Sequence, residues 1–191
     1  MVITLERIRS FIAIDIEDNS ILDKLSMVQN ALARSGAKLK LVERENIHIT
    51  IRFLGNIPLI LIDDIAKIIE SAKRPKFKIE IRGVGAFPSL NRPRVVWAGV
   101  GCGAEIIEEI HRKIEIGLKK LGFKSESEKF VPHITLARIK SGRNVSEIVR
   151  VLHDYRDAFF GEMLVEHIRL KKSTLTSRGP IYSTLREISL T

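Results

Sequence analysis

The chain contains the string His-Ile-Thr twice, and the two copies occupy matching places in two similar stretches of sequence. They lie in the segments His48–Ile51 and His133–Leu136, and in each an aliphatic residue follows the threonine. The separation between Phe11 and His48 nearly equals that between Trp97 and His133. Repeated spacing of this kind indicates an internal duplication. We therefore expect two related structural units, each of which contributes one His-x-Thr segment.

The first half of the chain predicts strands and helices in an alternating order. Apolar residues at helical spacing, Ile21, Leu25, Val28 and Leu32, predict a helix over residues 20–34 that ends at Gly36. Pro58 is typical of a helix start and introduces a second helix over 59–72. Runs rich in β-branched residues predict strands over 10–16, 38–42, 47–54 and 77–81.

The second half repeats this order. We expect strands over 95–100, within 130–139 and over 162–172, helices over 104–120 and 145–155, and an additional strand over 181–188. The predicted fold class is α+β, with two pseudo-symmetric lobes of sheet and outer helices around a central groove. We assign residues 1–191 to a single bilobal domain. Its pseudo-repeats span about 7–83 and 94–172, and a C-terminal strand covers 181–190.

Composition narrows the cellular setting. The chain has 191 residues, of which 45% are hydrophobic, yet none of its apolar runs is long enough to span a membrane. Its N-terminus lacks a secretory pattern, and a single cysteine, Cys102, excludes an internal disulfide framework. A cytoplasmic location is expected. The net charge of +9 favours a polyanionic partner such as RNA.

The side chains of each His-x-Thr segment are placed to act together. On a strand, residues two apart point to the same face, so His48 and Thr50 share a face, as do His133 and Thr135. A histidine on a strand is usually a structural residue, but two copies at equivalent places in a duplicated chain indicate a function. We expect both segments to face one cleft.

Two imidazoles and two hydroxyls suit phosphodiester chemistry without a metal. A neutral imidazole takes a proton from attacking water, and a protonated one donates to the leaving oxygen, since histidine titrates near neutral pH. The threonine hydroxyls would hold the phosphate oxygens, together with Arg138, three residues beyond Thr135. The pattern alone does not say which histidine is acid and which is base.

Two other interpretations of the same residues stay open. In the first, the pocket is a non-catalytic module that binds RNA ends. In the second, His48 and His133 are metal ligands, although no His, Asp or Glu cluster accompanies either segment. The glycine-rich segment 99–103 is interpreted as a tight turn into a helix, because it lacks the spacing of a phosphate-binding loop. We expect His111 and His153 to be solvated on helices, and His167 to lie on a strand face.

The chain resembles a known family at a series of ordered stretches. The matching segments are Arg9–Ile14, His48–Gly55, Phe87–Pro88, Arg94–Val100, Pro132–Arg138, Ser173–Leu175 and Gly179–Tyr182. In these segments it is similar to the 2H phosphoesterase superfamily, and within it to the RNA 2',3'-cyclic phosphodiesterases, also called 2'-5' RNA ligases. The resemblance extends along the whole chain.

The resemblance implies a substrate, a reaction and a set of site residues. The expected activity is metal-independent and cofactor-free hydrolysis of RNA 2',3'-cyclic phosphate ends to 2'-phosphates, with reversible 2'-5' ligation that needs no ATP. RNA ends such as tRNA halves would be the substrates, and a monomer is favoured. The implied general acid is His48 and the implied general base is His133. Thr50, Thr135 and Arg138 would bind the phosphate, Phe11 would stack on the terminal base, and Ser173, Arg178 and Tyr182 would line the cleft.

Overall fold

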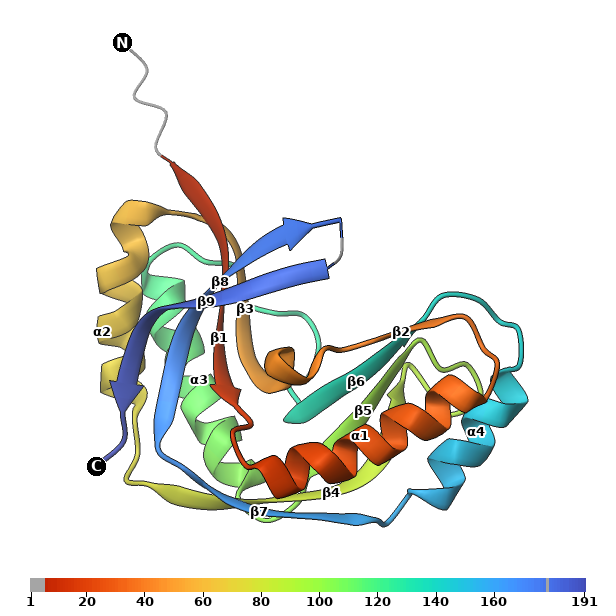
Figure 1. The fold of residues 1–191 in the computed structure, drawn as a ribbon. Coiled ribbons are helices and arrows are strands. Elements are labelled where there is room, and N and C mark those ends of the chain that lie inside the picture. The colour runs from red at the N-terminus through yellow and green to blue at the C-terminus, as the bar shows by residue number, and fades with distance from the viewer. Residues whose placement is uncertain (1–5, 178) are drawn as a thin grey trace.

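The computed structural model describes residues 6–177 and 179–191, which form one strongly bent antiparallel sheet with helices packed along its outside (Figure 1). The strands are β1 (Arg7–Asp15), β2 (Leu39–Leu41), β3 (His48–Pro58), β4 (Phe77–Phe87), β5 (Val95–Val100), β6 (His133–Ile139), β7 (Phe159–Val165), β8 (His167–Thr176) and β9 (Gly179–Ser189). The α-helices are α1 (Asn19–Arg34), α2 (Ile62–Ala72), α3 (Ala104–Lys120) and α4 (Val145–Asp154). Short 3-10 turns cover Arg44–Asn46 and Leu59–Leu61.

The sheet consists of two halves that meet at β3 and β6. The strand order is β7-β4-β5-β6-β3-β1-β8-β9, and β2 pairs with the end of β6. Between β3 and β6 the described ladder has one register pair, Ile49 with Ile134, whereas neighbouring strands within each half pair over many residues. The predicted α+β fold with two lobes is confirmed. The two His-x-Thr strands lie side by side at the junction of the lobes.

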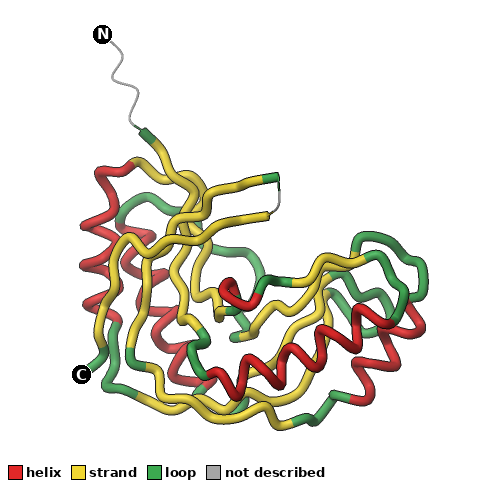
Figure 2. Tube along the Cα trace, viewed as in Figure 1, coloured by secondary structure: helices red, strands yellow, loops and turns green. Residues whose placement is uncertain are grey.

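The helices cover the outer faces of the two halves in an exchanged arrangement. Helix α1 follows β1 along the chain but packs against α4, β6 and β7 of the other half. Helix α3 follows β5 and packs against α2 and β3. In the ribbon and tube views, α2 and α3 accordingly lie together at one side, and α1 and α4 at the other (Figures 1 and 2). One continuous apolar core, rich in isoleucine, joins these layers.

Local sequence chemistry explains most element boundaries. Asp18 caps α1 by accepting a hydrogen bond from the backbone N–H of Ile21 at 2.9 Å. Gly103 directly precedes α3 and has a φ of +86°. A Cβ at this residue would lie 2.4 Å from the carbonyl oxygen of Lys78, so the position requires glycine. Segment 99–103 is tied to β4 by backbone hydrogen bonds with Glu80. It is therefore the tight turn that the sequence predicted.

One predicted strand is wrong. Residues 162–172 form the end of β7 and the start of β8, separated at Glu166, and these two strands lie in opposite halves of the sheet. The buried positions change from Val165 to Ile168, so the two-residue alternation shifts by one at the break. Three consecutive apolar residues, Met163 to Val165, conceal that shift in the sequence.

Candidate active site

The register at the lobe junction sets how the four motif side chains face one another. Strands β3 and β6 are antiparallel, and the pair Ile49–Ile134 is completely buried beneath them. This register places His48 opposite Thr135, and Thr50 opposite His133. All four motif side chains are half-buried, while the isoleucines beside them are buried. The structure therefore brings both His-x-Thr segments to one cleft.

Both motif strands carry an irregularity at the same place. The pairing of β1 with β3 omits Ile51, and the pairing of β5 with β6 omits Leu136. Such a bulge reverses the side-chain alternation beyond it. As a result Phe53 and Arg138 turn toward the cleft side as exposed residues, and Arg52 turns to the buried side. Phe53 and Arg138 thus occupy equivalent positions of the duplicated fold.

Each histidine is oriented by the same backbone device. His48 Nδ1 lies 2.6 Å from the carbonyl oxygen of Asn46, and His133 Nδ1 lies 2.7 Å from that of Val131. A carbonyl oxygen only accepts hydrogen bonds, so both Nδ1 atoms carry a proton and donate it. Nε2 of each ring is consequently the atom that gains or loses a proton. His48 Nε2 also lies 2.9 Å from the Thr50 hydroxyl, which donates to it when the imidazole is neutral.

Burial lowers the pKa of both histidines below the ordinary value of 6.5. Donation to the Asn46 carbonyl opposes this shift of the His48 pKa, whereas the positive charge of Lys171 adds to it. For His133 the hydrogen bond to Val131 opposes the shift in pKa, and the guanidinium of Arg138 adds to it. The phosphate of a bound ligand would raise both pKa values again, because a negative charge stabilises the imidazolium.

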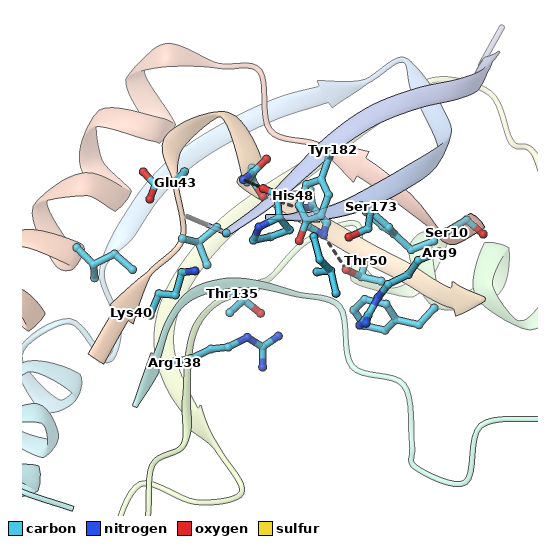
Figure 3. A pocket seen from close by; sticks show the side chains of 18 of the residues that line it. Arg9, Ser10, Lys40, Glu43, His48, Thr50, Thr135, Arg138, Ser173 and Tyr182 are labelled. Carbon is cyan, nitrogen blue, oxygen red and sulfur yellow. Dashed lines mark hydrogen bonds between the residues drawn. The ribbon is translucent and has the colours of Figure 1, made fainter. Parts of the chain in front are cut away.

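A hollow of about 530 Å³ opens above His48 and holds most of the predicted site residues. It lies between the β8–β9 hairpin and strands β2 and β6, and Figure 3 shows side chains entering it from both sides. Predicted residues in its lining are Phe11, His48, Thr50, Thr135, Arg138, Ser173 and Tyr182. Predicted residue Arg178 lies outside the described residues.

The same hollow contains cations that the sequence reasoning missed. Arg9, Lys40 and Lys140 line it together with Arg138, and Glu43 is the carboxylate among its lining residues. The side chains of Arg9 and Lys40 come from β1 and β2, which flank the motif strands (Figure 3). Among the described residues that line it, four cations against one carboxylate make this hollow suited to an anion. The nine surplus positive charges of the composition were a general signal, but they did not locate these residues.

Phe11 does not offer a stacking surface in this structure. Its side chain is 2% exposed and packs against His48, with ring centroids 5.1 Å apart, and against Tyr182 at 4.8 Å. Tyr182 also meets the His48 ring edge-on at 5.4 Å. Phe11 is therefore a buried neighbour of the imidazole, and the half-buried Tyr182 is the more exposed of the two aromatic rings that contact His48.

His133 borders a second hollow, of about 900 Å³, which residues of β3 and of the segment before β6 line. Thr50 and Phe53 line both hollows, so the two are continuous along the cleft. The segment between α3 and β6, Ser125–Val131, forms the far wall of the second hollow. Each histidine thus has its own hollow beside it.

The remaining histidines lie away from this cleft. The prediction that His111 is solvated is wrong: its side chain is 14% exposed, and its ring stacks on Phe130 with centroids 4.0 Å apart. A neighbour brought from a distant loop leaves no signal in the sequence around His111. His153 is exposed on α4 and His167 is half-buried on β8, as predicted.

Clustered metal ligands and long apolar helices are absent from the described residues. Over residues 6–177 and 179–191, no group of three or more His, Cys, Asp or Glu residues is arranged to hold a metal ion. Within the same ranges, no helix has the length and apolar character needed to cross a membrane.

Comparison with known proteins places the chain in a family. The model of the family "LigT like Phosphoesterase" matches residues 14–97 and again 100–182. The RNA 2',3'-cyclic phosphodiesterase of Aeropyrum pernix is 44% identical over 86% of this chain and 94% of its own. That of Methanocaldococcus jannaschii is 38% identical over 94% of this chain and 99% of its own.

Solved structures agree on the fold. A Thermus thermophilus protein aligns over 95% of this chain and 97% of its own, with a TM-score of 0.79 and 27% identity. Escherichia coli LigT complexed with 3'-AMP aligns over 97% and 99%, with a TM-score of 0.77 and 20% identity, a likeness of fold alone. The predicted resemblance to the family is therefore confirmed, and the chain belongs to the LigT-like phosphoesterase family of the 2H superfamily.

Proposed function

We propose that the protein hydrolyses 2',3'-cyclic phosphates at RNA ends to 2'-phosphates. The observation that carries this proposal is the pair of imidazoles at the lobe junction, each with Nδ1 held by the carbonyl of the residue two positions earlier. Fixed in this way, both rings exchange protons through Nε2 at the junction of the two lobes. The names of the relatives from Aeropyrum pernix and Methanocaldococcus jannaschii support the same substrate class.

The terminal nucleoside fits the basic hollow beside His48. There Arg9, Lys40, Arg138 and Lys140 attract the phosphates of the RNA chain, and Tyr182 lines the same hollow, where a base can stack on it. Stacking of a base on an aromatic ring tolerates any base identity, as an RNA-end enzyme requires. We assign Ser173 to the same wall and give Phe11 a supporting place behind His48.

In this pose the leaving O3' faces His48 and water approaches from the side of His133. Neutral His133 takes a proton from the water through Nε2 while the oxygen of that water attacks phosphorus. The P–O3' bond then breaks, and protonated His48 gives its Nε2 proton to O3'. Thr50, Thr135 and Arg138 hold the non-bridging oxygens and stabilise the charge that develops on them. The product retains phosphate on O2'.

The same proton transfers also serve ligation. If the 5'-hydroxyl of a second RNA replaces water, the products are joined through a 2'-5' linkage without ATP. We propose tRNA halves as one source of such ends, a cytoplasmic location and a monomeric protein, since one chain carries both motif strands.

Incubating the protein with an oligoribonucleotide that ends in a 2',3'-cyclic phosphate, in excess EDTA, tests this function. We expect complete conversion to the 2'-phosphate, detected by mass spectrometry and by resistance of the product to a 3'-phosphatase. Binding without ring opening would establish an RNA-end binding module instead. Activity that disappears in EDTA and returns with zinc would establish a metal hydrolase in which His48 and His133 are ligands.

A further inference from the structure

The second hollow is larger than hydrolysis requires. Its volume of about 900 Å³ lies within the range of small-molecule binding sites, whereas a water molecule occupies about 30 Å³. His133, the base of the proposed mechanism, stands at its border together with Thr50. The volume of the second hollow therefore lies on the side from which the nucleophile approaches phosphorus in the proposed mechanism.

The duplication of the fold gives this hollow an aromatic surface. Phe53 occupies the position in β3 that Arg138 occupies in β6. Each lies three residues beyond its motif threonine and follows the bulge in its strand. Phe53 is 54% exposed, although its phenyl ring carries no polar group that gains from water. Arg138 lines the first hollow with His48, whereas Phe53 lines both hollows and its ring lies 6.2 Å from that of Phe11. An exposed ring in this place is suited to stack on a base.

The wall opposite Phe53 is held in place by a buried arginine. Arg52, which is 8% exposed, donates from Nη2 to the carbonyl oxygen of Lys124 at 2.6 Å and from Nη1 to the Glu126 carboxylate at 3.0 Å. Its Nε donates to Glu115 of α3. The His111–Phe130 stack fixes the next turn of the same segment. The hollow is therefore formed before any ligand enters.

The charges of the two hollows differ in a way that identifies the ligand. Cations dominate the first hollow, which suits a cyclic phosphate anion. In the second, Arg52, Arg94 and Lys129 are accompanied by Glu126 and Glu128, and Arg52 also pairs with Glu115 of α3. Such a balanced lining suits an RNA end that carries an uncharged hydroxyl rather than a terminal phosphate.

From these observations we propose that the second hollow binds the 5'-terminal nucleoside of an acceptor RNA, with its base on Phe53. This proposal rests on the proposed function and locates its ligation reaction. The acceptor's 5'-hydroxyl gives its proton to Nε2 of His133, and its oxygen forms the new bond to phosphorus. The P–O3' bond breaks, and His48 supplies the proton that O3' takes up. One phosphodiester replaces another, so no ATP is consumed.

The ratio of joined to hydrolysed product tests this site. The donor is an oligoribonucleotide ending in a 2',3'-cyclic phosphate, and the acceptor is a dinucleotide with a free 5'-hydroxyl and a blocked 3' end. In the unaltered protein we expect the ratio to rise and then saturate as acceptor is added. In Phe53→Ala the ratio at fixed acceptor falls about tenfold, the loss expected for one stacked base. Phe53→Tyr restores it.

Phe159 provides a matched control, because it is an aromatic residue of similar exposure, 47%, on edge strand β7. Phe159→Ala is expected to leave the ratio unchanged. Hydrolysis without a saturable joined product, or an equal ratio in Phe53→Ala and the unaltered protein, would overturn the acceptor site and leave the hydrolase intact. A donor that is not opened under any condition would overturn both.

Discussion

At the scale of residues, the two histidines share a backbone anchor but differ in their surroundings. His48 lies among Phe11, Tyr182 and the Thr50 hydroxyl. His133 lies beside Phe87, with ring centroids 5.0 Å apart, and at 6.3 Å from Trp97, the single tryptophan of the chain. The pseudo-symmetry of the motifs is thus broken by their neighbours. Distinct acid and base roles become available to two residues of the same type.

Trp97 should report the titration of His133. Because a protonated imidazole quenches indole emission, we expect the fluorescence to fall as the pH decreases through the pKa of His133. Burial lowers that pKa, so the midpoint should lie below 6.5. His133→Ala should remove the transition. A midpoint above 6.5, or a transition that survives the substitution, would contradict the local environment described for this residue.

The pH dependence of kcat/KM follows from the same two shifts in pKa. The base must be neutral, so activity is lost as pH falls through its pKa. The acid must be protonated, so activity is lost as pH rises through its own. With both pKa values lowered by burial, kcat/KM should be maximal below pH 6.5. The profile for kcat should lie at higher pH, because bound phosphate raises both values. A kcat/KM maximum above neutral pH would be inconsistent with these assignments.

Residue-level prediction succeeded where the pattern was periodic and failed where contacts were distant. The alternation along each motif predicted that His48 and Thr50 share a face. Phe11 alternates in the same way, but its burial depends on Tyr182 from the far end of the chain. The stacking of His111 on Phe130 depends on a loop path that periodicity does not describe.

At the scale of elements, the bulges in β3 and β6 determine which side chains reach the cleft. Without them, regular alternation would have placed Arg52 beside Thr50 and turned Phe53 away. Sequence patterns predicted the helices α1 and α3 nearly to the residue, because caps and glycines mark their ends. Bulges and the break at Glu166 lack such markers, since register depends on the partner strand.

We expect Arg52 to contribute more to the free energy of unfolding than an exposed charged residue does. Arg52→Met removes the ion pairs to Glu115 and Glu126 and the hydrogen bond to the Lys124 carbonyl, and so releases the wall of the second hollow. We expect the free energy of unfolding to fall by about 3 kcal/mol, as for other buried pairs broken on one side. Urea titration would measure it.

Arg186→Met serves as the comparison for this substitution. The ion pair of Arg186 with Asp63 is exposed, with side-chain exposures of 48% and 70%. Its loss should change the free energy of unfolding by less than about 1 kcal/mol. Equal effects of the two substitutions would show that the Arg52 cluster does not hold the wall.

At the scale of the whole molecule, the two sheet halves exchange helices, and the ladder that joins β3 to β6 has one register pair, Ile49 with Ile134. Each half is therefore completed by a helix from the other part of the chain, and the cleft lies where the halves join. Counting repeats predicted two related lobes around a groove. The repeats could not predict that α1 and α3 each pack against the opposite half, because the two helices hold equivalent places in the repeats and each could fit either half.

The concentration of cations in the first hollow should make RNA binding dependent on salt. We expect KM for an oligoribonucleotide with a cyclic phosphate end to rise steeply with ionic strength, since each phosphate contact releases bound counterions. For a mononucleoside 2',3'-cyclic phosphate, which carries one charge, the rise should be much smaller. Identical salt dependence of the two substrates would mean that the hollow contacts only the terminal phosphate.

The most direct measurement of the central claim is the rate of ring opening in His48→Ala and His133→Ala, with an oligoribonucleotide 2',3'-cyclic phosphate as substrate. Each substitution removes one proton transfer, so we expect a loss of roughly 10²–10⁴-fold in kcat for each variant. His153→Ala, which changes an exposed histidine on α4, should retain the original rate. A variant at His48 or His133 that folds normally and opens the ring at the unaltered rate would contradict the paired-histidine mechanism.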